Sequence, residues 1–296
     1  MGEHVQATRK PPWLRKKINY TDAIHEVKSV LGGLALHTVC KSARCPNLSE
    51  CFHNKRATFL ILGNTCTRGC RFCSIEKSKG AHLLPPDATE PERLVDAVRS
   101  LGLRYVVITS VTRDDLPDGG ATQFAQTVKL LREYSAELKI EVLTPDFLGN
   151  RAAIDTVAQS GPDVFNHNVE TVPRLYRKIR PGADYDRSLN FLSYLSARYP
   201  SIYLKSGLMV GLGETREEII RVLKDLRSAG CSSVTIGQYL QPGADNVPVV
   251  EYVNPALFTR YRREAEKLGF SYIASGPYVR SSYMAHEGYE RLKQHE

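Results

Sequence analysis

The sequence predicts an α/β fold, and within that class an open, partial (β/α)6 barrel. From residue 58 onward, six short apolar runs alternate with segments of helical periodicity. Such alternation indicates parallel strands joined by right-handed helical crossovers. Polar or glycine-rich stretches follow four of the six runs, at the positions where βα folds gather their functional groups. Six units are fewer than the eight of a closed barrel, so we expect an open one. A doubly wound sheet is the alternative.

The six predicted strands are short runs rich in apolar residues. In chain order they are TFLILG (58–63), RYVVITS (104–110), LKIEVLT (138–144), DVFNHNVE (163–170), IYLKSGLMVG (202–211) and SVTIGQYL (233–240). The predicted helices lie between and after these runs, and several end at a glycine such as Gly102 or Gly230. Their ranges are 90–101, 121–135, 150–160, 187–198, 215–229 and 255–268.

Two extensions lie outside the βα pattern. We expect a TIM-like barrel at residues 58–275, an N-terminal extension at 1–57 and a C-terminal extension at 276–296. Neither extension has the composition of a separate globular domain, so both are expected to pack on the barrel. A chain of 296 residues suits one large domain of this kind.

Composition and charge limit the class of protein. No stretch approaches the roughly 18 consecutive apolar residues of a membrane span, and the first 17 residues contain no apolar signal segment. We therefore expect a cytoplasmic protein with no membrane partner. The formal charge of +8 indicates an anionic partner, either nucleic acid or an acidic protein surface.

Cysteine is the most informative residue type. Six of the seven cysteines lie between Cys40 and Cys73, and only Cys231 stands apart. In a reducing compartment, clustered cysteines are metal ligands more often than disulfides. The isolated Cys231 is expected to be a buried small hydrophobe.

The first cysteine cluster follows the first predicted strand directly. Cys66, Cys70 and Cys73 have the spacing Cx3Cx2C, on a loop in which Gly69 supplies turn freedom. A structural zinc site takes four ligands, and the later sequence contains no pair of cysteines such as CxxC that would supply the fourth. Iron–sulfur clusters are also held by thiolates, and three thiolates leave one iron open to another ligand. The spacing favours an iron–sulfur site, with structural zinc as the alternative.

A second cluster lies upstream. Cys40, Cys45 and Cys51 have the spacing Cx4Cx5C, and again only three thiols are present. The spacing is compatible with a zinc knot or with a second iron–sulfur cluster. Two adjacent serines, Ser281 and Ser282, lie near the end of the chain in the segment RSSY.

These motifs together resemble a known family. An aromatic residue within Cx3Cx2C, after the first strand of a partial barrel, is similar to the motif of the radical S-adenosylmethionine (SAM) enzymes. The combination with Cx4Cx5C and RSSY resembles lipoyl synthases. The likeness extends through PPWLRKK, DDLPDGGA, FNHNVETVPRLY, IRPGADY, KSGLMVGLGE and GPYVRSSY.

The resemblance implies two [4Fe–4S] clusters and SAM as cofactors. The trio Cys66, Cys70 and Cys73 would hold the cluster whose open iron binds SAM and cleaves it to a 5′-deoxyadenosyl radical. The trio Cys40, Cys45 and Cys51 in the N-terminal extension would hold an auxiliary cluster. The resemblance assigns its fourth ligand to the RSSY serine. We place that role on Ser282 and keep Ser281 as the alternative, because spacing does not separate them.

The implied activity is that of a sulfurtransferase. Such an enzyme inserts sulfur at C6 and C8 of an octanoyl chain on a lysine of a lipoyl carrier domain, with the auxiliary cluster as sulfur source. The implied carriers are E2 subunits of 2-oxoacid dehydrogenases and the glycine-cleavage H protein. A flavodoxin or ferredoxin would donate electrons, and a cluster-assembly or repair protein would restore the consumed cluster. No appended nucleic-acid module is evident, so no nucleic-acid partner is expected.

Two other classes of protein remain as alternatives. One is a different radical SAM sulfur-inserting enzyme that acts on a small molecule or on tRNA. The other is a basic, zinc-stapled protein that binds RNA without catalysis.

Five residues are candidate SAM contacts. Gly119 and Gly120 would let the backbone approach the methionyl group, or would simply form a loop turn. Asn168 and Glu170 lie two apart on a predicted strand, so they project to one side and would bind ribose hydroxyls, or would be polar groups of the core. Arg180 would pair with the SAM carboxylate.

Overall fold

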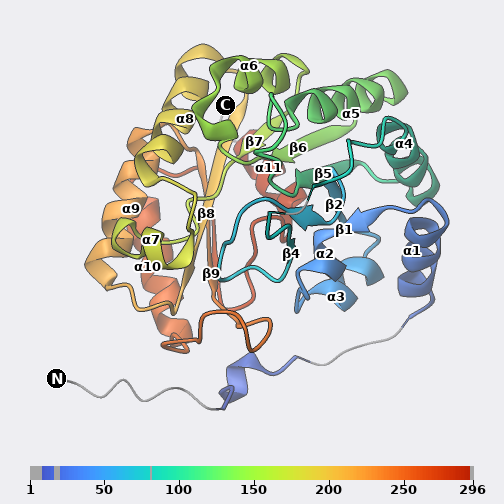
Figure 1. Ribbon diagram of the computed structural model, residues 1–296. Coiled ribbons are helices and arrows are strands. Elements are labelled where there is room, and N and C mark those ends of the chain that lie inside the picture. Colours follow the sequence, from blue (N-terminus) through green and yellow to red (C-terminus); the bar gives the residue numbers. More distant parts are fainter. Residues whose placement is uncertain (1–8, 17–20, 81, 294–296) are drawn as a thin grey trace.

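The computed structural model describes residues 9–16, 21–80 and 82–293 (Figure 1). Parts of the predicted extensions, residues 1–8, 17–20 and 294–296, lie outside these described residues, as does residue 81.

A single large sheet forms the centre of the described chain. Its eight strands adjoin in the order β1-β2-β5-β6-β7-β8-β9-β10. Neighbours from β2 to β10 are parallel, whereas β1 is antiparallel to β2. The strands are β1 (His37–Thr38), β2 (Thr58–Ile61), β5 (Tyr105–Ser110), β6 (Lys139–Leu143), β7 (Val164–Asn166), β8 (Tyr203–Val210), β9 (Ser233–Gln238) and β10 (Tyr272–Gly276). A small second sheet pairs β3 (Thr65–Cys66) with β4 (Glu76–Lys77).

The predicted partial barrel is confirmed, with one parallel strand more than the six expected and with the short antiparallel strand β1 added at its edge. The parallel strands follow one another in chain order without a reversal, so the doubly wound alternative is wrong. The additional parallel strand, β10, was not predicted because only Tyr272, Ile273 and Ala274 are buried before small residues follow. The fourth predicted strand ends at Asn166 rather than at residue 170, since only three of its residues pair continuously with β6 and β8.

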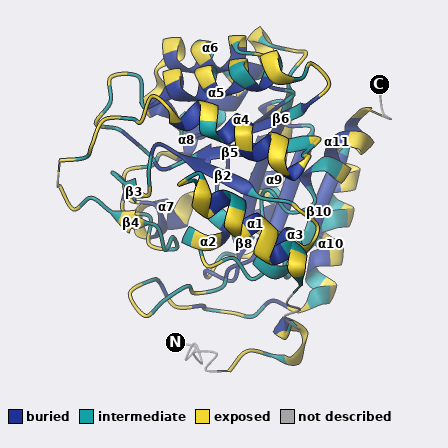
Figure 2. Cartoon of the chain, turned by 90° about the vertical axis from the view of Figure 1, so that its right-hand side faces the viewer, coloured by how far each residue is buried: buried dark blue, intermediate teal, exposed yellow. Residues whose placement is uncertain are grey.

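Amphipathic helices cover the outer face of the sheet (Figures 1 and 2). Their apolar sides are buried against the strands, while the opposite sides are exposed. The helix after β8 begins with a capping box, in which Thr215 and Glu218 satisfy each other's backbone N–H groups. These helices are α4 (Glu90–Leu101), α5 (Ala121–Tyr134), α6 (Arg151–Gln159), α8 (Tyr185–Arg198), α9 (Arg216–Ser228) and α10 (Pro255–Lys267).

Short helical turns connect several of these elements. They are η1 (Pro12–Leu14), η2 (Phe147–Gly149), η3 (Pro173–Leu175) and α7 (Tyr176–Ile179).

The two ends of the described chain meet beside the amino-terminal ends of the strands. The N-terminal extension folds into α1 (Asp22–Gly33), α2 (Val39–Ser42) and α3 (Leu48–His53), and the chain ends in α11 (Ala285–Lys293). The Tyr289 ring of α11 lies 6.1 Å from the ring of Tyr105 and 5.8 Å from that of Tyr203. Helix α11 therefore packs over the strand starts of β5 and β8. No helix among the described residues is both long enough and apolar enough to cross a membrane.

Candidate metal centres

The first cysteine trio lies beyond the carboxyl end of β2. Cys66 is the last residue of β3, and its Sγ atom accepts N–H groups from Arg68 at 3.4 Å and Thr112 at 3.3 Å. These two contacts hold the Cys66 sulfur atom in place at the end of β3. The side-chain amide of Asn246 donates to the backbone oxygen of Cys73 at 3.0 Å. Hydrogen bonds thus fasten the loop to neighbouring parts of the chain.

The thiols of this trio are close enough to perturb one another. Burial raises the pKa of Cys70, which the charge of Arg180 opposes. Burial also raises the pKa of Cys73 to about 12, with Cys66 and Cys70 adding to the effect. A metal bound by Cys70 and Cys73 would have to displace protons from these two thiols.

Arg180 provides a test of whether the site fits SAM. Its Nη1 donates to the backbone oxygens of Asn168 and Val169, each at 3.1 Å, and to the Tyr176 hydroxyl at 2.9 Å. Its buried Nε has no partner among the described residues. The same side chain lies near enough to Cys70 for its charge to oppose the rise of the thiol's pKa, so the guanidinium group borders the first trio. Such a donor fits a carboxylate, and SAM carries one.

Asn168 and Glu170 lie together as predicted, although the regular strand has already ended. The Asn168 amide donates to Glu170 Oε1 at 3.1 Å. Glu170 has a φ of 64°, a left-handed conformation that costs a non-glycine residue on the order of 1 kcal/mol or more. Burial raises the pKa of its carboxyl group, against the charge of Arg180. Strain of this kind is frequent at ligand-binding sites.

The paired glycines have a structural explanation. Gly119 and Gly120 have φ values of 61° and 90°, which favour glycine. A Cβ atom on Gly119 would lie 2.9 Å from Cδ1 of Phe147, and one on Gly120 would lie 2.2 Å from Cδ1 of Leu62. Their N–H groups bond within the loop itself. The turn and its packing thus require both glycines, and a contact with SAM stays a prediction.

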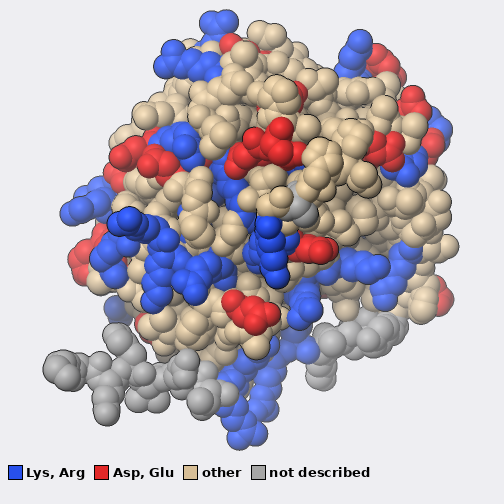
Figure 3. Space-filling view, viewed as in Figure 1, with Lys and Arg blue, Asp and Glu red and all other residues tan. Residues whose placement is uncertain are grey.

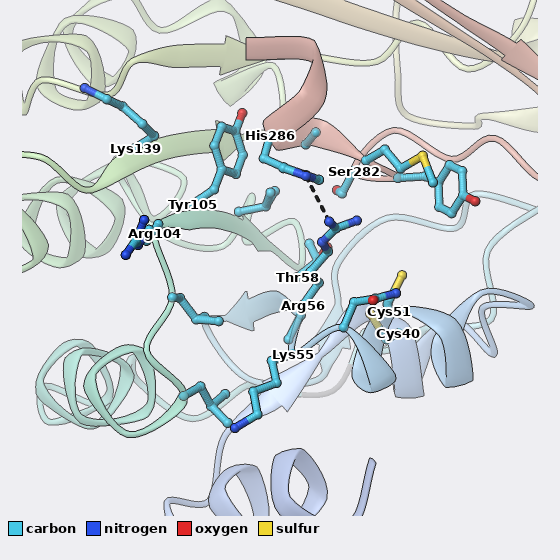
Figure 4. A pocket seen from close by; sticks show the side chains of 18 of the residues that line it. Cys40, Cys51, Lys55, Arg56, Thr58, Arg104, Tyr105, Lys139, Ser282 and His286 are labelled. Carbon is cyan, nitrogen blue, oxygen red and sulfur yellow. Dashed lines mark hydrogen bonds between the residues drawn. The ribbon is translucent and has the colours of Figure 1, made fainter. Parts of the chain in front are cut away.

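The second trio gathers at the opposite, amino-terminal end of β2. Cys40 and Cys51 line a cavity of about 510 Å³, together with Ser282 from the far end of the chain (Figure 4). Burial raises the pKa of Cys40 to about 11 and that of Cys51 to about 12, and Cys45 contributes to both shifts. Hence all three thiols lie within electrostatic range of one another. In the described chain, no three His, Cys, Asp or Glu side chains lie close enough to bind a single metal ion.

The two serines have different surroundings. The Ser281 hydroxyl accepts a hydrogen bond from the Asn166 amide at 2.8 Å and donates one to Asn168 Oδ1 at 3.0 Å. Ser282 has no hydrogen-bond partner in the described chain, and it borders the cavity with Cys40 and Cys51. The structure therefore favours Ser282 over Ser281 as the available oxygen ligand, and the cavity accommodates a group larger than one ion.

Sequence reasoning missed the charged residues that lie between the two trios. Desolvation lowers the pKa of the half-buried Arg280, and Cys45 and Glu170 lie near enough for their charges to oppose that shift. Glu141 of β6 and Lys205 of β8 form a buried ion pair of 2.9 Å that spans the intervening strand β7. A signal for that pair was present, because each charge interrupts an otherwise apolar run.

Cys231 is a buried core residue, as expected, and two histidines have hydrogen-bond partners within the described chain. Cys231 is fully buried in the core. His167 lies within 2.9 Å of the Thr144 carbonyl oxygen and 3.0 Å of the Ser188 hydroxyl, and burial lowers its pKa to about 4. His286 accepts from Arg56 at 2.9 Å on the cavity wall (Figure 4).

Comparison with known structures agrees with the fold. The chain superposes on methylornithine synthase with a TM-score of 0.52 and 15% identity, over 87% of this chain and 83% of that one. On a maturase of the [FeFe]-hydrogenase, HydG, it superposes with a TM-score of 0.54 and 14% identity, over 93% of this chain and 79% of that one.

Comparison of sequences is more specific. Residues 60–242 match the radical SAM superfamily, and residues 2–45 match the N-terminal domain of lipoyl synthase. A lipoyl synthase of Caldanaerobacter subterraneus subsp. tengcongensis is 55% identical over 95% of this chain and 97% of its own length. A lipoyl synthase of Geobacter metallireducens is 54% identical over 94% of this chain and 96% of its own length. The chain therefore belongs to the lipoyl synthase family of the radical SAM superfamily.

Proposed function

We propose that this chain converts a carrier-bound octanoyl chain to a lipoyl group by inserting sulfur at C6 and C8. The observation that carries the proposal is the pair of cysteine trios at opposite ends of β2. One trio lies near Arg180, whose buried Nε has no partner in the described chain, and Cys40 and Cys51 of the other line a cavity with Ser282. When bound, a [4Fe–4S] cluster with SAM would supply a radical able to break an unactivated C–H bond, and a second cluster would supply sulfur.

The first trio and its neighbours would hold and orient SAM. Cys66, Cys70 and Cys73 would ligate one cluster through three thiolates, which leaves a coordination position for SAM. Arg180 would donate its free N–H to the carboxylate, and Asn168 with Glu170 would bind the ribose hydroxyls. Gly119 and Gly120 would shape the turn beside the methionyl group. The buried Asn168 and Arg180 would limit the access of water to a highly reactive species.

The second trio would hold the auxiliary cluster with help from the end of the chain. Cys40, Cys45 and Cys51 would supply thiolates, and Ser282 would supply an oxygen. A hard oxygen ligand suits an iron–sulfur cluster poorly, so the iron bound to Ser282 would be held less firmly than the others. This arrangement divides the protein into an N-terminal extension (1–57), the barrel (58–275) and a C-terminal extension (276–296), with both extensions needed for the second site.

The surface charge supports acidic partners. Figure 3 shows Lys and Arg side chains gathered over the lower half of one face, and α7 in that region carries Arg177 and Lys178. Acidic carrier domains, such as octanoylated E2 subunits or the glycine-cleavage H protein, would be attracted to such a face. A flavodoxin or ferredoxin would supply electrons, and a cluster-assembly protein would restore the second cluster. Seven free cysteines suit a reducing compartment, and we place the protein in the cytoplasm.

Iron and sulfide analysis tests this proposal. We would reconstitute the wild-type chain anaerobically beside a variant with Cys40, Cys45 and Cys51 replaced by alanine. Two four-iron clusters predict about eight irons in the wild type and about four in the variant. The wild type should then convert an octanoylated carrier peptide, whereas the variant should cleave SAM without inserting sulfur. Four irons in both proteins, or zinc in place of iron, would contradict the proposal.

A further inference from the structure

The first serine of the RSSY segment has a fully engaged hydroxyl group. Ser281 Oγ accepts from Asn166 Nδ2 at 2.8 Å and donates to Asn168 Oδ1 at 3.0 Å. A serine hydroxyl has a single O–H, so its donor is fully used by Asn168. Both partners lie at the carboxyl end of β7, 115 and 113 residues away in the chain. Ser281 therefore fastens the C-terminal extension to the inside of the barrel.

Asn166 is itself held in one orientation. Its amide nitrogen also donates to Glu141 Oε1 at 2.8 Å, and Glu141 accepts from Lys205 at 2.9 Å and from the Tyr105 hydroxyl at 2.7 Å. An ionised carboxylate only accepts hydrogen bonds, so the NH₂ group of the amide must face Glu141. Asn166 and Glu141 are completely buried, and Lys205 is 4% exposed. Ser281 is thus bonded to a rigid, buried network.

Ser282 lies between two anchors. On one side Ser281 is bonded to β7, and on the other side the Tyr283 hydroxyl donates to Glu50 of α3 at 2.7 Å. The intervening backbone is a turn in which the Tyr283 N–H bonds the Arg280 oxygen at 3.0 Å. Because both neighbours are fixed to different parts of the molecule, the side chain of Ser282 is confined to the edge of the cavity that Cys40 lines.

We propose that Ser281 is a positioning residue for the second cluster. By bonding Asn166 it orients the turn so that the Ser282 hydroxyl meets the thiols of Cys40 and Cys51. The proposal rests on the function proposed above and deepens it. A serine oxygen is a weak ligand for such a cluster, so its binding depends on being held in place beforehand. Groups that orient metal ligands in this way change metal affinity by about 10- to 100-fold when removed.

The test measures how firmly the second cluster is held. Ser281→Ala is made in a chain whose Cys66, Cys70 and Cys73 are alanine, so that the iron present belongs to the second site. A chelator should remove that iron about 10- to 100-fold faster than from the parent chain. Ser275→Ala is the matched control, since the half-buried hydroxyl of Ser275 on β10 donates to the Phe258 carbonyl oxygen of α10 at 2.8 Å. The control should lose iron at the parent rate, and equal rates for Ser281→Ala and the parent would overturn the proposal.

Two further comparisons guard against simple loss of folding. Ser281→Thr retains a hydroxyl and should keep the iron. Ser281→Val, which has the shape of threonine without the hydroxyl, should release it. The two metal-free variants should melt at the same temperature. Ser282→Cys should hold the cluster firmly and alter its electron paramagnetic resonance spectrum, but Ser281→Cys should not. The reverse result would make Ser281 the ligand and overturn the proposal. A wild type with only four irons would instead contradict the proposed function, because no second cluster would be present. This result is distinguishable from a failure of the proposal for Ser281 alone.

Discussion

The hydroxyl of Tyr283 donates a hydrogen bond of 2.7 Å to Glu50, a residue 233 positions earlier in the chain. A second contact strengthens the connection, because the Asn47 amide donates to the Tyr278 backbone oxygen at 2.7 Å. These bonds join the C-terminal extension to α3, which carries Cys51. The second cysteine trio and its candidate oxygen ligand are therefore brought together by contacts between the two ends of the described chain.

Removal of this hydrogen bond should loosen the second cluster. In Tyr283→Phe, we expect a loss of about 1–2 kcal/mol in unfolding free energy and a faster release of about four of the eight irons to a chelator. Tyr194→Phe is the control, because Tyr194 donates to Asp155 at 2.8 Å on the outer surface. It should lose a similar hydrogen bond and keep all its iron. Identical iron release from both variants would contradict a specific role for Tyr283.

Replacement of Ser282 should separate the two clusters functionally. Ser282→Ala is expected to weaken the second cluster and abolish sulfur insertion, while SAM cleavage at the first trio stays largely intact. Ser282→Cys should bind the second cluster more firmly, because a thiolate is a softer ligand, and should release sulfur more slowly. SAM cleavage and sulfur insertion are measured side by side by product analysis. An equal loss of both activities in Ser282→Ala would count against the division of labour.

Arg180 should control SAM affinity. Arg180→Lys keeps a positive charge but loses the planar N–H geometry, so we expect SAM binding to weaken by roughly 10- to 100-fold, or about 1.4–2.8 kcal/mol. Equilibrium dialysis with iron-loaded protein measures this, with iron content checked in parallel. Arg174→Lys is the control, because Arg174 is half-exposed and pairs with Glu218 at 2.7 Å. Unchanged SAM affinity in Arg180→Lys would rule out the carboxylate contact.

Removal of only one partner of the buried Glu141–Lys205 ion pair should lower the stability of the fold strongly. Lys205→Met leaves Glu141 buried without its cation, and we expect a loss of about 3–5 kcal/mol. The double variant Glu141→Gln with Lys205→Met should recover part of that loss, since no charge is left unpaired. Urea unfolding of the metal-free proteins gives both values. A single variant as stable as the wild type would show that the ion pair contributes little.

His167 should make stability depend on pH. Burial, aided by the charge of Arg180, lowers its pKa from 6.5 to about 4 in the folded protein. Between these values the unfolded chain binds a proton that the folded chain does not, so stability falls as pH decreases. The loss contributed by this residue reaches on the order of 3 kcal/mol at pH 4. Urea midpoints at pH 7, 5.5 and 4 should therefore fall more steeply for the wild type than for His167→Gln, and parallel curves would contradict this assignment.

The sequence by itself determined the fold class and the two cysteine trios. The βα alternation is a local pattern, and the spacing of Cys66, Cys70 and Cys73 places three thiols on one loop after a strand. Both signals are contained within short stretches of chain, so they can be recognised without knowledge of the tertiary contacts. The strand β10 was missed for the same reason, because its buried part is too short to produce a recognisable pattern.

Only the tertiary structure distinguished the two serines and revealed the charges between the trios. Ser281 and Ser282 are chemically identical and adjacent, and what separates them is the hydrogen bond from Asn166, 115 residues away. Likewise, Arg280 approaches both Cys45 and Glu170 because the C-terminal extension folds back into the barrel. Contacts at such sequence separations depend on how the whole chain packs, and no local pattern of residues encodes them.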